Sequence, residues 1–392
     1  MIIGDAVVPT GYSRMIRKIF EPIRHEYQIT HLATRYDGAT HDYPWELIPA
    51  VDYGDVYGLT RLDECVDRVR PDIVFIMYDL SYQDRYVARI RAAVARPKIV
   101  VYSPIESGPI EPEILDRLGD VSRYVVFGDE ARDVVHHASA RPYRSEPTFA
   151  AEVVVIPHGV DTTDFFPIEG GQREARRRLG LIGVGLEDAF IVFNGNRNLV
   201  KKRLDITIEG FARFAADKPA DVKLLIHAET EGTGFNLDVL ARRFGVGDRL
   251  IRTSEGAGVP NLSTADLNLV YNACDVGVNT SISEGWGLVS FEHAATRHAQ
   301  IVPASPCLRQ LWGSNAVLIE PSAIITNPGL LTNSHLVAAG DLATALEMLY
   351  DDPARRHKMA DLAFRHATRP ELSWPVIGQQ WTRLFRGLTD DG

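Results

Sequence analysis

Cysteine is scarce in this chain. The 392 residues contain three cysteines, Cys65, Cys274 and Cys307, and no pair of them has CxxC spacing. An odd number of scattered cysteines argues against a disulfide framework and against a zinc site built from such pairs. A reducing compartment fits this composition, and we expect a cytoplasmic protein.

Basic residues are in the minority, and long apolar runs are missing. Lys and Arg total 42 against 52 Asp and Glu, which gives a formal net charge of −10. This balance gives no support to a nucleic-acid or anionic-membrane binder, because a phosphate surface attracts clustered Lys and Arg. No run of about 18 apolar residues occurs, and the amino terminus has no basic leader. We therefore expect no nucleic-acid partner, no secretion signal and no transmembrane segment.

Two common ligand motifs are missing as well. The first apolar run is followed by PTGYSR (9–14) instead of GxGxxG, which argues against a nicotinamide cofactor. Within this segment, Gly11 either lets a donor approach the backbone closely or only forms a tight turn. No Asp-x-Asp follows a predicted strand, so we expect no catalytic metal and no other cofactor.

The sequence does contain a regular alternation of short apolar runs and amphipathic segments. Continuous apolar runs followed by helical periodicity predict buried parallel strands in βαβ units. The runs lie at 1–8, 72–78, 97–103, 123–128 and 152–157, and again at 190–196, 222–228, 250–254, 275–281, 299–305 and 316–321. Because 392 residues exceed what one core usually supports, we expect two domains.

Segment 158–181, rich in Gly, Pro and Asp, separates the two series of runs. This composition is typical of an interdomain linker. The same alternation on both sides of it predicts an α/β fold with two doubly wound domains facing across a cleft. Ligands of such sheets bind at the carboxyl ends of the strands, so candidate site residues are expected in the loops that follow them.

Cations follow the first strand of the second series, in NGNRNLVKKRLD (194–205). A loop and a helix amino terminus that hold two cations form an anion site, because exposed N–H groups and the helix dipole add to their charge. For Arg197 and Lys202 we favour phosphate binding. For Lys201 and Arg203 we favour a solvated basic face.

Two acids bracket a glycine turn in SISEGWGLVSFEHAA (281–295). The turn leaves backbone amides uncovered at the start of a predicted helix, which suits a diphosphate. Glu292, one turn inside that helix, can accept hydrogen bonds from a ribose diol. Taken singly, Glu284 is explained as a helix N-cap and Glu292 as a neutralised buried acid, but their pairing favours a ligand. The donor-binding backbone is assigned to Gly285, Trp286, Gly287, Leu288 and Val289.

These motifs resemble a known family. The segments 194–205 and 267–295, with VIPHGVDTTDFFP (155–167) upstream, are similar to the retaining GT-B glycosyltransferases of family 4, the group 1 glycosyl transferases. Members of that family share an E-x7-E motif, an Arg–Lys pair and a linker of the form IPNGVD. The resemblance is specific because three separated motifs agree in order and spacing, and it spans most of 153–385.

The resemblance implies two Rossmann-like domains. The amino-terminal domain, placed at 1–165, would bind the acceptor, and the carboxyl-terminal domain, placed at 166–374, would bind a nucleotide-activated sugar. The last helix, 375–392, would cross back to the first domain. That crossing would bury Trp374 and Trp381.

The resemblance also implies roles for the candidate residues. Arg197 and Lys202 would hold the donor diphosphate, Glu284 would face the hydroxyls of the donor sugar, and Glu292 would bind the ribose. The amides of 286–289 would complete the site. The implied reaction retains the anomeric configuration, by front-face attack in which the leaving phosphate helps to deprotonate the acceptor.

The sequence departs from the family at two positions. His158 stands where the linker usually has Asn. Near 102–109, where many members have a histidine, the occupant is Glu106. Either Glu106 contacts the sugar or acceptor, or it caps a helix. If it acts on the sugar, its carboxylate can stabilise positive charge at the anomeric carbon.

Two further strand ends carry polar side chains. After the run at 72–78, Asp79 and Tyr82 either form a wall for an acceptor hydroxyl or serve as loop caps. After the run at 222–228, His227 and the glycines that follow either shape the nucleotide pocket or are structural.

The sequence therefore predicts a retaining, metal-independent glycosyltransferase that moves a sugar from a nucleoside-diphosphate sugar to a hydroxyl of a small-molecule or glycan acceptor. Two other functions are open. The same fold serves nucleotide-sugar epimerases and glycosyl phosphorylases, and a protein of this kind can bind a nucleotide sugar without turning it over. The base, the sugar, the acceptor and the oligomeric state are not determined by these patterns.

Overall fold

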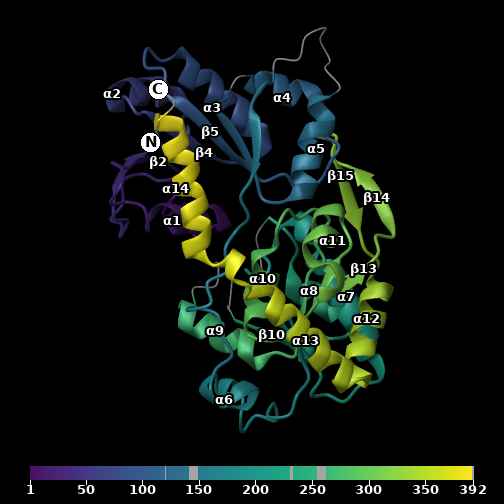
Figure 1. Cartoon of the computed structure of the whole chain (residues 1–392). Helices are drawn as coiled ribbons and strands as arrows, with labels where there is room; N and C mark the ends of the chain where they lie inside the picture. The colour runs from purple at the N-terminus through teal and green to yellow at the C-terminus, as the bar shows by residue number, and fades with distance from the viewer. Residues whose placement is uncertain (120, 141–148, 230–232, 254–261, 391–392) are drawn as a thin grey trace. The chain divides into compact units, whose positions relative to one another are not determined.

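The chain folds into two compact units (Figure 1). The computed structural model describes residues 1–119, 121–140, 149–229, 233–253 and 262–390. Unit 1 consists of Met1–Gly159, Asn327–Thr332 and Glu371–Gly392, and unit 2 of Val160–Thr326 and Asn333–Pro370. Each unit is built around its own parallel sheet, which confirms the predicted fold of two doubly wound α/β domains.

Unit 1 contains a seven-stranded parallel sheet in the order β3-β2-β1-β4-β5-β6-β7. The strands are β1 (Ile2–Asp5), β2 (Thr30–Thr34), β3 (Glu46–Pro49), β4 (Ile73–Met77), β5 (Lys98–Ser103), β6 (Arg123–Val126) and β7 (Glu152–Val155). Five of them lie in the predicted apolar runs, whereas β2 and β3 were not predicted. Their sequences, THLAT and ELIP, are too polar to form such runs.

Helices pack on this sheet and supply the rest of the unit 1 core. They are α1 (Gly11–Phe20), α2 (Leu62–Val69), α3 (Leu80–Ala92), α4 (Pro112–Leu118), α5 (Asp129–Ser139) and α14 (Trp374–Asp390). The last of these is the end of the chain, and it lies beside α1 (Figure 1).

The apolar face of α14 holds it in unit 1. Trp381 is fully buried, with its ring centroid 5.4 Å from that of Phe75 and 4.9 Å from that of Tyr102. Phe385 stacks on Phe20 of α1 at 5.7 Å. Large aromatic side chains bury much apolar surface, and this burial is the main force that fixes a helix on a sheet. The expected return of the last helix to the first domain is confirmed.

Unit 2 contains a six-stranded parallel sheet in the order β10-β9-β8-β11-β12-β13. The strands are β8 (Ile191–Asn194), β9 (Lys223–Ile226), β10 (Leu250–Arg252), β11 (Val276–Val278), β12 (Ala299–Pro303) and β13 (Val317–Ile319). All six lie in predicted runs. An antiparallel hairpin of β14 (Ala323–Thr326) and β15 (Asn333–Leu336) was not predicted.

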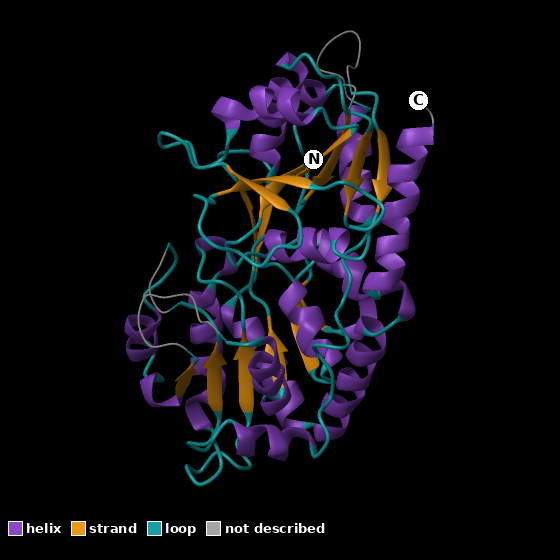
Figure 2. Cartoon of the chain, turned by 90° about the vertical axis from the view of Figure 1, so that its left-hand side faces the viewer, coloured by secondary structure: helices purple, strands orange, loops and turns teal. Residues whose placement is uncertain are grey.

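The helices of unit 2 cover both faces of its sheet (Figure 2). They are α6 (Gly171–Arg178), α7 (Leu204–Phe214), α8 (Leu237–Arg243), α9 (Thr264–Ala273), α10 (Leu288–Ala295), α11 (Pro306–Trp312), α12 (Ala339–Asp351) and α13 (Pro353–Ala367). Among the helices of the described ranges, none is long and apolar enough to cross a membrane.

The strand order reverses once in each sheet. In unit 2, β8 has β9 on one side and β11 on the other. In unit 1, β1 lies in the same way between β2 and β4. Loops that leave two such strands diverge to opposite faces and leave a crevice at the carboxyl edge, where ligands of open α/β sheets bind. The topology therefore places one candidate crevice in each unit.

We predict that Trp381→Ala destabilises the protein by about 3–5 kcal/mol, because it removes a fully buried ring and leaves a cavity. Urea unfolding followed by tryptophan fluorescence and far-UV circular dichroism measures the loss. Arg383→Ala, at an exposed position of the same helix, is the control and should change stability little. A loss below about 1 kcal/mol for Trp381→Ala would contradict the assigned packing.

Candidate functional site

Buried hydrogen bonds join the two loops at the switch point of unit 2. Ile282 N donates to Lys201 O at 2.9 Å. Thr280 Oγ1 lies 3.0 Å from Lys202 O and 2.9 Å from Arg203 O, and 2.8 Å from Thr207 Oγ1 on α7. These bonds fix the loop after β8 against the loop after β11. They place the candidate residues of the two loops side by side.

Lys202 and Glu284 form an ion pair across this junction. Their side chains are only 13% and 12% exposed, so water screens their attraction little. Burial alone would raise the pKa of Glu284, but the charge and hydrogen bond of Lys202 lower it below its usual value. Glu284 therefore keeps its negative charge.

Gly287, and not Glu284, is the N-cap residue of α10. It adopts φ of +84°, a left-handed conformation that favours glycine. The N-cap explanation of Glu284 is therefore wrong. The amides of Leu288 and Val289, the first two of α10, follow directly after the Glu284 turn, and amides at these positions have no partner inside a helix.

Trp286 contributes its backbone and not its ring to the turn. The side chain is 3% exposed and stacks on Phe291 at 4.9 Å, in the core of unit 2. The buried ring is therefore not available to a ligand. The ring instead anchors the turn, which keeps the amides of Gly287 and Leu288 in place.

Glu292 lies one turn further along α10. It is 6% exposed, and its Oε2 accepts a hydrogen bond of 2.9 Å from the hydroxyl of Tyr271 on α9. The ring of Tyr271 packs on Phe193 and His293. Tyr271 is a site residue that the sequence did not reveal, because its spacing from Glu292 has no motif. Its hydroxyl orients the carboxylate.

Arg197 lies on the same loop as Lys202 but is exposed. Among the described residues, its side chain makes no hydrogen bond or ion pair, so the structure does not pair the guanidinium with Lys202 or Glu284. Its guanidinium is available for a further partner. The two predicted cations thus differ: one is anchored by an acid, and the other is not.

A second buried side chain shapes the β8 loop. Asn198 is fully buried, donates to Glu229 O at 3.1 Å and Phe235 O at 2.6 Å, and accepts from Phe235 N at 2.9 Å. A Cβ at Gly234 would overlap it. This clamp holds the loop after β9 against the Arg197 loop, and nothing in the sequence pattern indicated it.

The loop after β9 also carries His227. Its Nδ1 lies 2.7 Å from Thr253 Oγ1, and burial lowers its pKa below the usual value. A neutral, hydrogen-bonded imidazole fits the structural interpretation of this histidine. Of the glycines expected to act with it, Gly232 lies outside the described residues.

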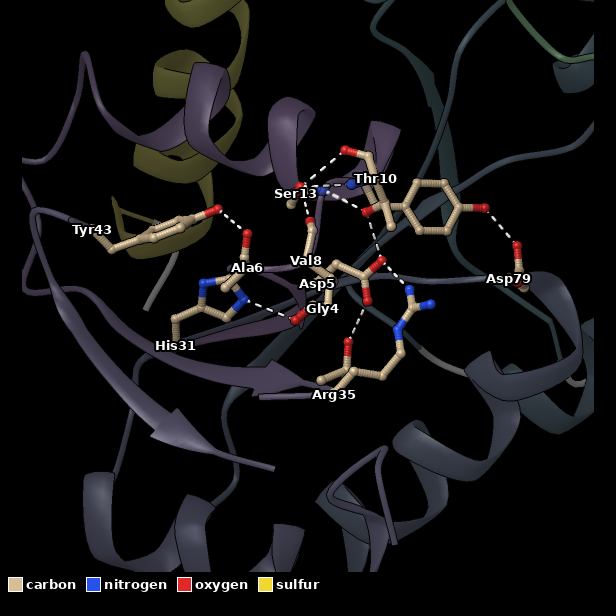
Figure 3. Close-up of polar contacts among 12 residues, drawn as sticks. Gly4, Asp5, Ala6, Val8, Thr10, Ser13, His31, Arg35, Tyr43 and Asp79 are labelled. Carbon is tan, nitrogen blue, oxygen red and sulfur yellow. Dashed lines mark hydrogen bonds and ion pairs between the residues drawn. The ribbon is translucent and has the colours of Figure 1, made fainter. Parts of the chain in front are cut away.

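The crevice of unit 1 is organised around a buried acid, Asp5, at the end of β1 (Figure 3). Its carboxylate accepts hydrogen bonds from Thr34 at 2.5 Å and Thr10 at 2.7 Å, and it forms an ion pair with Arg35. Thr10 also caps α1, in a reciprocal pair with Ser13. Asp5 therefore fixes the strand ends and the helix start together.

Gly11 and Asp79 lie in the loops on either side of this crevice. Gly11 is the first residue of α1, which fits the tight-turn interpretation. Asp79 precedes α3 but makes no capping bond there. Its carboxylate instead accepts a hydrogen bond of 2.5 Å from the hydroxyl of Tyr12, so the capping explanation of Asp79 is wrong (Figure 3). Tyr82 packs on Tyr57 with ring centroids 4.6 Å apart.

Glu106 lies in the loop after β5 and is half-buried. The N-cap residue of α4 is Glu111, so Glu106 does not occupy that cap. Burial raises the pKa of Tyr12 well above its usual value, and the charges of Asp79 and Glu106 raise it further. The three residues therefore belong to one electrostatic neighbourhood.

The substituted linker residue His158 is buried against Tyr102, with 3.0 Å between its Nδ1 and the tyrosine oxygen. Burial lowers the pKa of His158 to about 3. The imidazole is therefore neutral, and it packs in the core where the family usually has an uncharged amide.

We predict that Lys202→Met reverses the direction in which Glu284 makes the stability of the fold depend on pH. With Lys202 present, the lowered pKa gives stability above the unfolded value of 4.5 that is lost as the pH falls through the folded value. Without the cation, burial raises the pKa of Glu284, so stability falls as the pH rises above the unfolded value. Near neutral pH the variant should be about 3–5 kcal/mol less stable than the wild type.

Urea unfolding between about pH 4 and pH 7 measures this effect. The double variant Lys202→Met/Glu284→Gln removes both charges of this pair and serves as the control. Its stability difference from the wild type should change less with pH. Parallel pH profiles for Lys202→Met and the wild type would disprove the ion pair.

Comparison with known proteins gives a consistent picture. No protein-family model matches the chain. A protein named D-inositol 3-phosphate glycosyltransferase from Thermomonospora curvata is 30% identical over 358 residues, which cover 85% of this chain and 75% of that protein. One of the same name from Corynebacterium aurimucosum is 27% identical over 260 residues. That match covers 65% of this chain and about half (54%) of the relative's length.

Solved structures share the fold. Sucrose-phosphate synthase from Thermosynechococcus elongatus superposes with a TM-score of 0.75 at 14% identity, over 100% of this chain and 96% of that one. Anabaena Alr3699/HepE, in complex with UDP and glucose, gives 0.71 at 18% identity, over 98% and 99%. Together with the extent of the Thermomonospora match, these findings show that the chain belongs to the group 1 glycosyltransferases with the GT-B fold.

Proposed function

We propose that this chain is a retaining, metal-independent glycosyltransferase that moves a sugar from a nucleoside-diphosphate sugar to an acceptor hydroxyl. The observation that carries the proposal is the buried Lys202–Glu284 pair at the switch point of unit 2, next to the amino terminus of α10. A uridine donor is the first to test, because Anabaena Alr3699/HepE, which shares the fold, is in complex with UDP.

The phosphate end of the donor determines the chemistry. Breaking the anomeric C–O bond leaves negative charge on the departing diphosphate, so groups that stabilise that charge lower the barrier. Lys202, Arg197 and the amides at the start of α10 supply this stabilisation. The exposed Arg197 and the anchored Lys202 are both assigned to the diphosphate.

The two acids bind the neutral parts of the donor. Glu284 stays ionised beside Lys202, and an ionised carboxylate accepts strong hydrogen bonds from sugar hydroxyls. Glu292, oriented by Tyr271, is assigned to the ribose diol. The carboxylate of Glu284 thus has two partners: it positions the ammonium of Lys202, and it orients the donor sugar.

The remaining steps require few protein groups. We assign acceptor deprotonation to the leaving phosphate, with attack on the face that it vacates, which retains the anomeric configuration. Glu106 of unit 1 is assigned to the positive charge that develops on the sugar. Asp79 and Tyr82 are assigned to the acceptor. Because Arg197, Lys202 and the helix amides already offset the diphosphate charge, no metal is required.

We predict that Arg197→Ala lowers kcat about 10²–10³-fold at saturating acceptor, because it removes a cation that acts on the leaving group. The side chain is exposed, so the fold should be unchanged. Lys202→Ala should lose at least as much activity. Arg213→Ala is the control, since Arg213 pairs with Glu209 at the surface of α7. Normal turnover in both site variants would disprove the assignment.

The assay measures release of nucleoside diphosphate from UDP-glucose and related donors, with and without an acceptor panel. Release that requires an acceptor identifies a transferase. Epimerised donor in the absence of an acceptor identifies an epimerase, and phosphate-dependent formation of a sugar phosphate identifies a phosphorylase. Tight donor binding without turnover identifies a binding protein.

We predict that EDTA leaves kcat unchanged within about twofold, because the cations and helix amides offset the diphosphate charge. Proton NMR of the product at the anomeric position should show the configuration of the donor. Activity that EDTA abolishes and that Mg²⁺ or Mn²⁺ restores would contradict metal independence. An inverted product would contradict retention.

A further inference from the structure

The crevice of unit 1 has a different chemical character from that of unit 2. It lies at the carboxyl edge between β1 and β4, where the strand order reverses. Four tyrosines gather there: Tyr12 from α1, Tyr57 and Tyr78 from the loops after β3 and β4, and Tyr82 from α3. We call these four residues the tyrosine surface.

The rings of the tyrosine surface contact one another in a chain. Tyr12 is 6.2 Å from Tyr78, Tyr78 is 5.4 Å from Tyr82, and Tyr82 is 4.6 Å from Tyr57, between ring centroids. Tyr78 is buried, whereas the other three are half-buried. The surface therefore offers aromatic ring edges and faces together with phenol hydroxyls, which is the usual composition of a wall that packs on a sugar-like ring.

Backbone hydrogen bonds fix the loop that carries Tyr57. Asp55 accepts from Tyr57 N and Thr60 N, each at 2.8 Å, and Arg35 N donates to Val56 O at 2.6 Å. A side chain on such a loop loses little entropy when it binds a ligand. The tyrosine surface is therefore preorganised.

Two charged side chains lie at this surface, and each uses one of its terminal atoms to bind a neighbouring residue. Arg35 is paired with buried Asp5 through Nη2, and its other terminal nitrogen points away from Asp5 (Figure 3). Asp79 accepts from Tyr12 through Oδ1. Within the described part of the chain, Asp79 Oδ2 and the remaining guanidinium donors of Arg35 have no hydrogen-bond partner. One fixed acceptor and one fixed donor group remain for a ligand.

The charges of the side chains at this surface favour some ligands over others. Asp5 and Arg35 cancel each other, the tyrosines are neutral, and Asp79 adds one negative charge that pairs only with a hydroxyl. The guanidinium of Arg85 lies over the ring of Tyr82, 5.3 Å from its centroid, and interacts with that ring. A phosphate ester that contacted Asp79 would meet a like charge, and like charges repel. A neutral ring with several hydroxyls would instead donate to Asp79, accept from Arg35 and lay its apolar face on the tyrosines.

We propose that unit 1 recognises the acceptor as a neutral, polyhydroxylated ring, a saccharide or cyclitol without a phosphate, through Asp79, Arg35, Tyr57 and Tyr82. This inference rests on the proposed function, which assigns the acceptor to unit 1. It separates this chain from the curated relatives, which are named for D-inositol 3-phosphate. The specificity-determining residue is Asp79.

Matched pairs of acceptors test the proposal: myo-inositol against D-inositol 3-phosphate, and glucose against glucose 6-phosphate. Nucleoside diphosphate release from UDP-glucose gives kcat/KM, and saturation-transfer NMR with UDP present gives binding without turnover. We expect the neutral member of a pair to be preferred at least about tenfold, since one charge-assisted hydrogen bond and one repulsion distinguish the two. Use of myo-inositol but not glucose would identify a cyclitol acceptor, and use of glucose but not myo-inositol would identify a saccharide.

Asp79→Ala should raise KM for the neutral acceptor about 10- to 100-fold, with the KM of the donor unchanged. Asp79→Asn keeps the shape of the side chain and removes its charge. It should therefore reduce the preference for the neutral acceptor over its phosphorylated partner. Asp84→Asn, on the same helix and paired with Arg117, is the control and should behave like the wild type.

The result that overturns the proposal is a phosphorylated acceptor that is bound or used better than its neutral partner, or binding of neither neutral ring. An Asp79→Ala variant with unchanged KM would also overturn it. Thermal stabilisation by UDP is measured in parallel. If neither UDP nor any other nucleoside diphosphate stabilises the protein, the proposed function fails, whereas nucleotide binding with a preference for phosphorylated acceptors defeats the acceptor inference alone.

Discussion

The reversal of strand order beside β8 is the constraint on which the candidate donor site depends. Parallel strands end at one edge, and the loops after β8 and β11 diverge there to opposite faces. The Thr280 and Ile282 hydrogen bonds close the two loops on each other, which brings together Lys202 and Glu284 from positions 82 residues apart. A buried charge is tolerated only with its partner, so the pair in turn holds both loops.

The same topology serves two kinds of surface in this chain. In unit 2, the crevice presents a cation, the ionised Glu284, a second acid at Glu292 and helix amides, which suit a nucleotide sugar. In unit 1, the corresponding crevice presents tyrosines around a neutralised Asp5–Arg35 pair. The sheet determines where a ligand binds, because the carboxyl edge is the same in both units. The loop side chains determine which ligand is bound.

Sequence patterns predicted the strands whose apolar side chains run without interruption, such as β4 and β8. They missed β2, although it is buried along its whole length, because it carries Thr30, His31 and Thr34. Those polar groups are compatible with burial because they have partners on neighbouring strands. Thr30 donates to Glu46 on β3. On β1, Gly4 O lies 3.0 Å from His31 Nε2, and Asp5 accepts from Thr34. Hydrophobic periodicity carries no signal for such partners.

The sequence by itself determined the glycine turn, the spacing of its two acids and the strands with continuous apolar runs, because these depend on backbone conformation and local periodicity. Only the tertiary structure decided which side chains pair: Glu284 with Lys202, Glu292 with Tyr271, and Asp79 with Tyr12. Each pair joins residues far apart in the chain. Such contacts depend on which strands are neighbours and on how their loops close, and no local spacing specifies either.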